Sequence, residues 1–306
     1  MAAKRILLIA NPAAGLCRGE QRLTRARTQL ETLGQTVTSA LTESPGHATR
    51  LAKSNHTDFE IIAALGGDGT VNEVADGLMD VEPSERPALA VLPAGTGNDV
   101  AQTFGLAKFE TAIDALAIGG TRTLDVIRAQ FMRDGNTATR HALLFVAAGF
   151  AAEVIRKTGP QVKRLLGRRF SYSAGLFRAL TGFRAPEFSV RWDDGKRSGR
   201  MFQVCAGNTE FAGGGVMRIS PGARPDDGLL NISLVDALGR LQIVRRFPSI
   251  LNGRYVEDER VDYFTAKRLE MDAVPTAEIQ ADGDIIGTTP ATIELLPNAL
   301  RLVTPE

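Results

Sequence analysis

The chain has 306 residues, of which 43% are hydrophobic and 23% are charged, so it is neither a disordered chain nor a fibre. This length predicts two globular domains. The 36 basic residues nearly balance the 35 acidic residues, and this near-neutral sum excludes a general attraction to nucleic acid.

Short apolar runs alternate with helical patterns along the N-terminal part of the chain. The runs at 6–10, 59–65 and 88–92 are apolar or nearly so throughout, which is typical of parallel strands buried on both faces. Apolar residues at helical spacing predict a helix over 19–33, and a second helix is expected at 47–54. This alternation predicts an open α/β domain.

A loop rich in glycine or other small residues follows each of these predicted strands. The loops are Asn11–Gly15 (NPAAG), Gly66–Thr70 (GGDGT) and Pro93–Asp99 (PAGTGND). Glycines allow positive φ angles and let backbone N–H groups approach a phosphate, while the next helix adds the positive end of its dipole. Because the carboxyl ends of parallel strands share one edge of a sheet, we expect the three loops to form one nucleotide-binding crevice.

Each loop also has a purely structural interpretation as a strand-to-helix turn. Thr70-Val71-Asn72-Glu73 has the sequence of a capping box, which predicts that Glu73 serves helix geometry. Thr96 and Asn98 are likewise suited to act only as helix caps. The sequence contains no P-loop, no nucleophile elbow and no zinc-protease motif, so those classes of site have no support.

From about Thr123 the pattern changes to short strand-like runs separated by turn residues. This change predicts that the α/β domain covers 1–123 and that an all-β domain, an antiparallel β-sandwich, covers 124–306. The last residues of the chain can return to the first domain. Helical stretches are expected at 162–183 and 239–251. The predicted strands of the sandwich are 188–192, 201–206, 229–235, 268–271, 277–280 and 292–296.

The three loops together resemble the diacylglycerol kinase catalytic family, and the whole chain resembles the YegS-type lipid kinases of bacteria. The resemblance implies a nucleotide domain and a β-sandwich lipid domain, with the active site in the cleft between them. It also implies Mg²⁺-dependent transfer of the γ-phosphoryl group of ATP to a lipid hydroxyl of the diacylglycerol or phosphatidylglycerol type. The matching segments are NPAAG at 11–15, GGDGTVNEV at 66–74, PAGTGND at 93–99, GGG at 213–215, DGL at 227–229 and DGD at 282–284.

The resemblance also implies the nucleotide and metal ligands. Magnesium is then held by Asp227 with the backbone carbonyls of Arg224 and Leu229, which suits an ion that takes only one or two carboxylates. The residues alone favour a β-turn at Pro225–Gly228. The implied ATP contacts are Asn11, Pro12, Gly15, Thr42, Gly66, Gly67, Asp68, Gly69, Thr70, Val71, Asn72 and Thr96.

Phosphoryl transfer to a hydroxyl needs a carboxylate that accepts the proton, and Asp282 and Asp284 are the candidate catalytic residues. Their spacing places both on one face of a regular strand, although Asp282-Gly283 equally suits a hairpin turn. The family pattern is Asp-Gly-Glu with the glutamate as acceptor, whereas this chain has the shorter Asp284. Either the backbone lies closer, or a water relays the proton to Asp284, or Asp282 takes the role; we expect Asp284 to be the base.

Residues 156–184 hold eight basic side chains and no acidic one, interleaved with leucine, phenylalanine and tyrosine. This basic stretch favours docking to an anionic membrane, and the alternative is a helix with a solvated basic face. The longest apolar run, 142–152, falls short of the ~18 residues of a membrane span. Two cysteines, Cys17 and Cys205, fit a reducing compartment. We therefore expect a cytoplasmic protein that is peripheral at the inner membrane surface.

Two other functions remain open from the sequence. The first is a kinase for a soluble substrate, such as an NAD kinase, because GGDGT also occurs in those enzymes. The second is a non-catalytic lipid-binding regulator with the same fold, which the departure at Asp284 motivates.

Overall fold

The computed structural model describes residues 3–17, 19–95, 97–158 and 182–305. Most of the helix predicted at 162–183, and most of the basic stretch at 156–184, lie outside the described residues. No helix within the described residues is long and apolar enough to cross a membrane.

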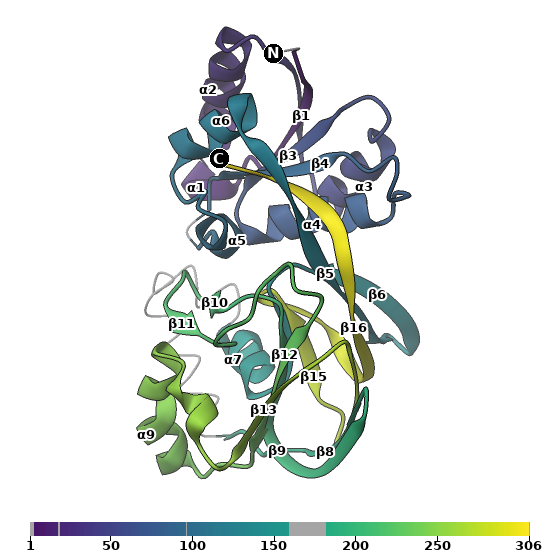
Figure 1. The fold of residues 1–306 in the computed structure, drawn as a ribbon, viewed down its shortest axis with the longest axis vertical. Coiled ribbons are helices and arrows are strands. Elements are labelled where there is room, and N and C mark those ends of the chain that lie inside the picture. The colour runs from purple at the N-terminus through teal and green to yellow at the C-terminus, as the bar shows by residue number, and fades with distance from the viewer. Residues whose placement is uncertain (1–2, 18, 96, 159–181, 306) are drawn as a thin grey trace. The chain divides into compact units, whose positions relative to one another are not determined.

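The chain divides into two compact units (Figure 1). The first comprises Met1–Val126, Gly213–Gly215 and Pro297–Glu306. The second comprises Ile127–Ala212 and Val216–Leu296. Two long strands, β5 (Gly120–Arg133) and β16 (Asp284–Thr304), contribute residues to both units.

The first unit contains a parallel sheet in the order β16-β4-β3-β1-β2. Its strands are β1 (Arg5–Ala10), β2 (Thr36–Leu41), β3 (Ile61–Gly66) and β4 (Ala88–Pro93), and the end of β16 joins β4 through Leu302 and Leu89. β3 and β4 are buried along their whole length, which explains their unbroken apolar sequences. The three predicted strands are confirmed to within two residues. Strand β2 was not predicted, because this edge strand alternates exposed polar and buried residues.

Helices cover both faces of this sheet (Figure 1). On one face α2 (Gly19–Thr32) contacts β1, β2 and α6 (Phe109–Ile118), and on the other α3 (His47–Ser54) packs on α4 (Asp68–Met79). The helices predicted at 19–33 and 47–54 are confirmed. Two short helices, α1 (Ala14–Cys17) and α5 (Asp99–Thr103), follow loops at the carboxyl ends of β1 and β4.

Buried polar residues fix the C-terminal segment to the first unit. The guanidinium of Arg86 donates hydrogen bonds to the carbonyls of Ala299 and Val81, and Arg86 is only 7% exposed. The buried carboxylate of Asp125 accepts a hydrogen bond from the N–H of Asn298 at 2.7 Å. These bonds place residues 297–305 against β4 although they come last in the sequence.

The second unit is built from antiparallel strands. Pairing runs from β9 through β8, β14, β16, β15 and β7 and back to β9, because β9 and β16 are long enough to pair at two levels. The inward side chains form one apolar core. The strands are β6 (Asn136–Ala142), β7 (Phe145–Gly149), β8 (Glu187–Trp192), β9 (Gly195–Gly207), β12 (Leu230–Asp236), β13 (Val261–Ala266), β14 (Arg268–Val274) and β15 (Glu278–Ala281), with parts of β5 and β16.

Each strand predicted for the sandwich falls on an observed strand, while β5, β6, β7 and β13 were not predicted. Helices α7 (Phe150–Thr158) and α9 (Arg240–Leu251), the short 3-10 helix η1 (Arg254–Glu257) and the hairpin of β10 (Phe211–Ala212) and β11 (Met217–Arg218) complete the unit. Helix α9 confirms the helix predicted at 239–251.

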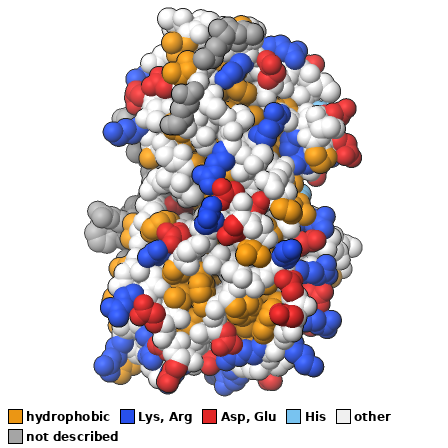
Figure 2. Space-filling view, viewed as in Figure 1, with side chains coloured by type: hydrophobic (Ala, Val, Ile, Leu, Met, Phe, Trp, Pro, Cys, Tyr) orange, Lys and Arg blue, Asp and Glu red, His pale blue; other side chains and the backbone are white. Residues whose placement is uncertain are grey.

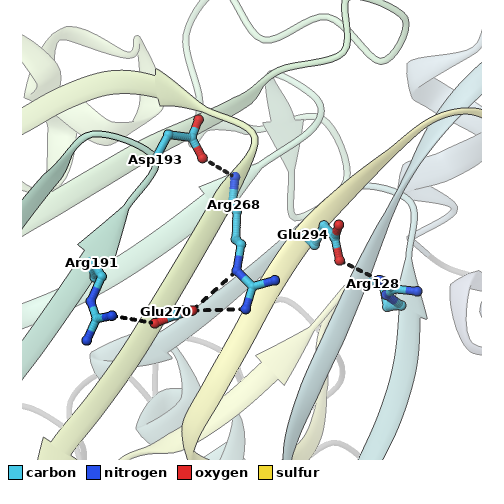
Figure 3. Close-up of polar contacts among 6 residues, drawn as sticks. All are labelled: Arg128, Arg191, Asp193, Arg268, Glu270 and Glu294. Atoms are coloured by element: carbon cyan, nitrogen blue, oxygen red, sulfur yellow. Dashed lines mark hydrogen bonds and ion pairs between the residues drawn. The ribbon is translucent and has the colours of Figure 1, made fainter.

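Ion pairs link neighbouring strands on the outside of the second unit (Figure 3). Glu270 on β14 contacts Arg191 on β8 at 3.6 Å and Arg268 on its own strand at 2.9 Å. Arg128 on β5 pairs with Glu294 on β16. Exposed pairs of this kind stabilise a fold by only ~0–1 kcal/mol each. Figure 2 shows basic and acidic side chains interspersed over one face of the molecule, as expected from the balanced charge.

Candidate functional site

The three sequence loops meet at the carboxyl edge of the parallel sheet in the first unit. The N–H of Asn11 donates to the carbonyl of Leu65 at 3.0 Å, and the N–H of Ala94 donates to the carbonyl of Gly66 at 2.7 Å. The N–H of Thr42, after β2, donates to Ala10 at 2.9 Å. Residues that were far apart in the sequence are therefore joined through their backbones, and the predicted convergence of the loops is confirmed.

Glycine is required where these loops touch. A Cβ on Gly95 would lie 2.5 Å from Cα of Gly67 and 2.9 Å from Oδ1 of Asn98. A Cβ on Gly15, whose φ is +60°, would lie 2.5 Å from the carbonyl oxygen of Ala94. Backbone atoms of neighbouring loops touch here, and such close backbone packing is typical of loops whose N–H groups approach an anion.

Polar side chains hold the loops in place. Asp68 accepts a hydrogen bond from the N–H of Val100, at the start of α5, at 3.2 Å. The amide of Asn11 donates to the hydroxyl of Thr70 at 3.5 Å, and its Oδ1 accepts from the N–H of Ala13 at 3.0 Å. Asn98 clasps its own loop, because Oδ1 accepts from the N–H of Gly95 and Nδ2 donates to the carbonyl of the same residue.

The remaining residues of the predicted nucleotide set differ in their exposure and in their hydrogen bonds. Gly69 is exposed at the first turn of α4, whereas Asn72 is 3% exposed and its Oδ1 has no hydrogen-bond partner among the described residues. Val71 is 2% exposed and packs in the core, and its N–H donates to the carbonyl of Gly67 at 3.2 Å. Pro12 and Gly67 are partly buried in their loops, and Thr96 lies outside the described residues.

The capping-box interpretation of Thr70–Glu73 is wrong. Helix α4 begins earlier, at Asp68, so Glu73 is not at the third position of the helix. Its carboxylate instead accepts hydrogen bonds from the N–H groups of Gly46 and Ala48, at 2.9 and 3.2 Å. Glu73 therefore caps the neighbouring helix α3, where an anionic side chain satisfies N–H groups that lack partners within the helix.

Asp99 connects the third loop, Pro93–Asp99, to a glycine segment far along the sequence, a role that sequence reasoning missed. Its carboxylate accepts hydrogen bonds from the N–H groups of Gly213 and Gly214. All three glycines at 213–215 have positive φ, and a Cβ on Gly215 would lie 2.7 Å from Oε1 of Gln102. The pairing of PAGTGND with GGG in the resemblance was the signal that could have suggested this contact.

The predicted metal ligands lie on a turn of the second unit, before β12. Asp227 is exposed, and its Oδ1 accepts a hydrogen bond from the N–H of Leu229 at 3.0 Å. Gly228 has a φ of +74°, and the guanidinium of Arg224 lies 3.7 Å from Asp226. The segment is thus the turn that the residues alone predicted. Among the described residues no cluster of three or more His, Cys, Asp or Glu side chains could hold a metal. One carboxylate beside main-chain carbonyls remains a hard oxygen set that suits Mg²⁺ completed by phosphate and water.

Glu210 fixes the segment that leads into this turn. Its carboxylate accepts hydrogen bonds from Arg218 at 2.6 Å and from the N–H of Gly222 at 2.6 Å. Burial alone would raise the pKa of Glu210, but these two hydrogen bonds and the Arg218 charge outweigh it and hold the pKa below its usual value. No motif pointed to Glu210.

Asp282 and Asp284 lie at a hairpin turn rather than on one regular strand. Asp282 and Gly283 have φ values of +47° and +93° between β15 and β16, which confirms the turn alternative. The carboxylate of Asp282 accepts hydrogen bonds from three consecutive N–H groups, those of Leu143, Leu144 and Phe145, at 2.8, 3.0 and 2.8 Å. Asp284 is exposed at the first position of β16.

Cys205, in contrast, is unsuited to chemistry. It is 2% exposed on β9, and burial raises the pKa of its thiol to about 12 although Ser233 offers a hydrogen bond. A thiol with so high a pKa is not a nucleophile at neutral pH.

Two family models of known proteins match this chain, one in each half of the sequence. The family model of the diacylglycerol kinase catalytic domain matches residues 5–129. The model of the YegS C-terminal NAD kinase beta sandwich-like domain matches residues 144–304.

Curated relatives and solved structures extend this similarity along the chain. A diacylglycerol kinase of Bacillus subtilis (strain 168) is 26% identical over 306 residues, which cover 99% of this chain and 97% of the relative. The Chromohalobacter salexigens protein named "Probable lipid kinase YegS-like" is 29% identical over 89% of this chain and 85% of its own length. A crystal structure of a diacylglycerol kinase from Bacillus anthracis str. Sterne has a TM-score of 0.75 at 24% identity, covering 99% of this chain and 98% of that one. Yeast NADH kinase complexed with NADH has a TM-score of 0.53 at 9% identity, over 100% of this chain and 85% of that one. The last two show likeness of fold alone.

Proposed function

Because this chain belongs to the diacylglycerol kinase family, with a YegS C-terminal domain after the catalytic domain, we propose that it transfers the γ-phosphoryl group of ATP to a lipid hydroxyl. Family membership makes it a lipid kinase. The diacylglycerol or phosphatidylglycerol type of substrate, and the use of ATP with Mg²⁺, are parts of the proposal.

The convergence of three backbone loops in the first unit is the observation that supports ATP. Gly15, Gly67 and Gly95 bring main-chain atoms within contact of one another, and the N-termini of α4 and α5 lie at the same sheet edge. N–H groups and helix dipoles provide a site for phosphate without a lysine-containing P-loop. The proposed nucleotide contacts are those that the family resemblance implies.

Asp227, with the carbonyls of Arg224 and Leu229, is the proposed Mg²⁺ site. When bound there, Mg²⁺ would neutralise charge on the transferred phosphoryl group. The Asx turn that fixes Asp227 is compatible with this role, because its hydrogen bond to Leu229 orients the carboxylate.

Asp284 is the proposed proton acceptor. The carboxylate of Asp282 already accepts three backbone hydrogen bonds, so its role in the proposal is to fix the turn and not to accept the proton. Asp284 follows two residues later, is exposed, and has its position set by that turn. The three hydrogen bonds to Asp282 therefore support Asp284, the first choice made from the sequence, over Asp282.

The test is phosphorylation of extracted lipid. The purified protein is incubated with labelled ATP, Mg²⁺ and vesicles that contain diacylglycerol or phosphatidylglycerol, and in parallel with NAD. Label in extracted lipid is expected, with a loss of at least ~100-fold in Asp227→Ala. Label that appears only in NAD would favour the soluble-substrate kinase, and vesicle binding without any transfer would favour the regulator.

A further inference from the structure

Helix α9 carries an apolar stripe on its outer side. Leu241, Val244 and Leu251 are 71%, 57% and 41% exposed, and Pro248 between them is also exposed. At about 100° per residue these four side chains fall within roughly 80° of the helix circumference. Large apolar residues exposed together on one helix face, rather than scattered singly, mark an interaction surface.

Arginines border this stripe on both sides. Arg240 projects on one edge and Arg245 on the other, by the same helical spacing of about 100° per residue; both are exposed. The sequence from Ala237 to Val256 contains no aspartate or glutamate. Arg246, which points away from the stripe, pairs with Asp258 at 2.6 Å. The exposed face of α9 is therefore apolar at its centre and basic at its margins.

The inner face of α9 already has its own partners. Ile243 is 9% exposed and packs in a cluster with Phe150, Phe202 and Val235. Phe183, near the end of the basic stretch, joins the same cluster. Helix α9 lies at the margin of the second unit in Figure 1, and the stripe faces away from the cluster that anchors the helix. The fold does not need the stripe for its core.

We propose that the outer face of α9, defined by Leu241, Val244, Pro248, Leu251, Arg240 and Arg245, docks on an anionic lipid bilayer. The apolar stripe enters the boundary between headgroups and acyl chains while the two arginines meet anionic headgroups, as in interfacial amphipathic helices. The occupant is a bilayer rather than an acidic protein, because four apolar side chains along one helix with cationic margins match an apolar interior under an anionic surface. This inference rests on the proposed function, since a lipid kinase must reach a substrate held in the bilayer. It assigns docking to α9, a segment that sequence reasoning did not consider for this role.

Vesicle flotation tests the proposal with the full chain. Wild-type protein should float with vesicles of phosphatidylglycerol and phosphatidylcholine and bind pure phosphatidylcholine vesicles less. The double variant Leu241→Glu/Val244→Glu should bind anionic vesicles at least ~tenfold more weakly, the scale of removing a buried leucine-sized contact. Ile118→Glu, which replaces a 61% exposed apolar residue at the end of α6, is the matched control and should bind within about twofold of wild type. Circular dichroism and thermal denaturation confirm that the variants are folded.

Two readouts separate this proposal from the proposed function. Phosphorylation of a short-chain diacylglycerol dispersed in detergent should survive the α9 double variant, whereas phosphorylation of vesicle-borne lipid should fall with flotation. Unchanged flotation of a folded double variant overturns docking through α9, even if lipid phosphorylation persists. If the double variant no longer floats and the wild type phosphorylates no lipid, the docking surface is supported and the kinase assignment is wrong. If light scattering shows a wild-type dimer that the double variant dissociates, a second copy occupies the face and the proposal is wrong.

Discussion

The pair Asp282→Asn and Asp284→Asn separates fold from chemistry at the hairpin turn. In Asp282→Asn one amide oxygen can still accept from Leu144 and Phe145, but the new NH₂ group faces the N–H of Leu143. An amide N–H left without its acceptor in a buried segment costs ~1–3 kcal/mol, and the charge of the remaining bonds is also lost. We expect a loss of about 2–3 kcal/mol in the free energy of unfolding. Asparagine tolerates positive φ, so backbone strain at 282 does not contribute.

Thermal denaturation measures the loss of stability in each variant, and lipid phosphorylation independently measures the loss of kcat. At about 2–4 °C per kcal/mol for a unit of this size, Asp282→Asn should lower Tm by roughly 4–12 °C. Asp284→Asn should change stability by less than ~0.5 kcal/mol, because the side chain is exposed. It should lower kcat by at least ~100-fold if Asp284 accepts the proton. A stable Asp282→Asn protein with low kcat, together with near-wild-type turnover in Asp284→Asn, would refute the reasoning.

Three further predictions follow from contacts in the two units. Gly95→Ala places a Cβ 2.5 Å from Gly67 and should weaken ATP binding at least ~tenfold by calorimetry; Gly120→Ala, which has nothing within 4 Å, should bind as wild type, and equal affinity of the two variants would exclude the steric argument. Glu73→Ala removes the cap of α3 and should lower the free energy of unfolding by ~1–2 kcal/mol in urea without changing kcat, and an unchanged urea midpoint contradicts this. The pKa of Glu210 lies below the usual value of a glutamate in the folded state, so its stabilising effect is present above that usual value and is lost as the pH falls through the lowered pKa. The stability difference between wild type and Glu210→Gln should therefore shrink from pH 7 to about pH 3, and a difference that grows on acidification would reverse the sign.

Local sequence determined the α/β architecture of the first unit. Strands β1, β3 and β4 are buried on both faces, so their sequences are unbroken apolar runs that need no tertiary information to be recognised. Strands β2, β5 and β6 were missed because they mix exposed polar residues with buried ones, so they contain no unbroken apolar run that marks the whole strand. The helix expected near 47–54 is confirmed as α3.

The roles of individual carboxylates depended on partners that no local pattern reveals. Glu73 reaches back to Gly46, 27 residues away, and Asp99 reaches Gly213, 114 residues away. Sequence reasoning assigned Glu73 to its own helix because capping boxes are the nearest local explanation. It had no means to place Asp99 against a glycine segment so far along the chain.

The sequence by itself determined the three loops that converge at the sheet edge, because glycines at strand ends and the order of motifs are properties of the linear chain. Only the tertiary structure decided that Asp282 anchors a turn through three N–H groups while Asp284 remains exposed. It alone showed which face of α9 packs on Phe150 and Phe202 and which apolar face is left outward. The physical reason is that backbone conformation depends largely on neighbours in sequence, whereas the role of a side chain depends on the distant groups that folding brings into contact with it.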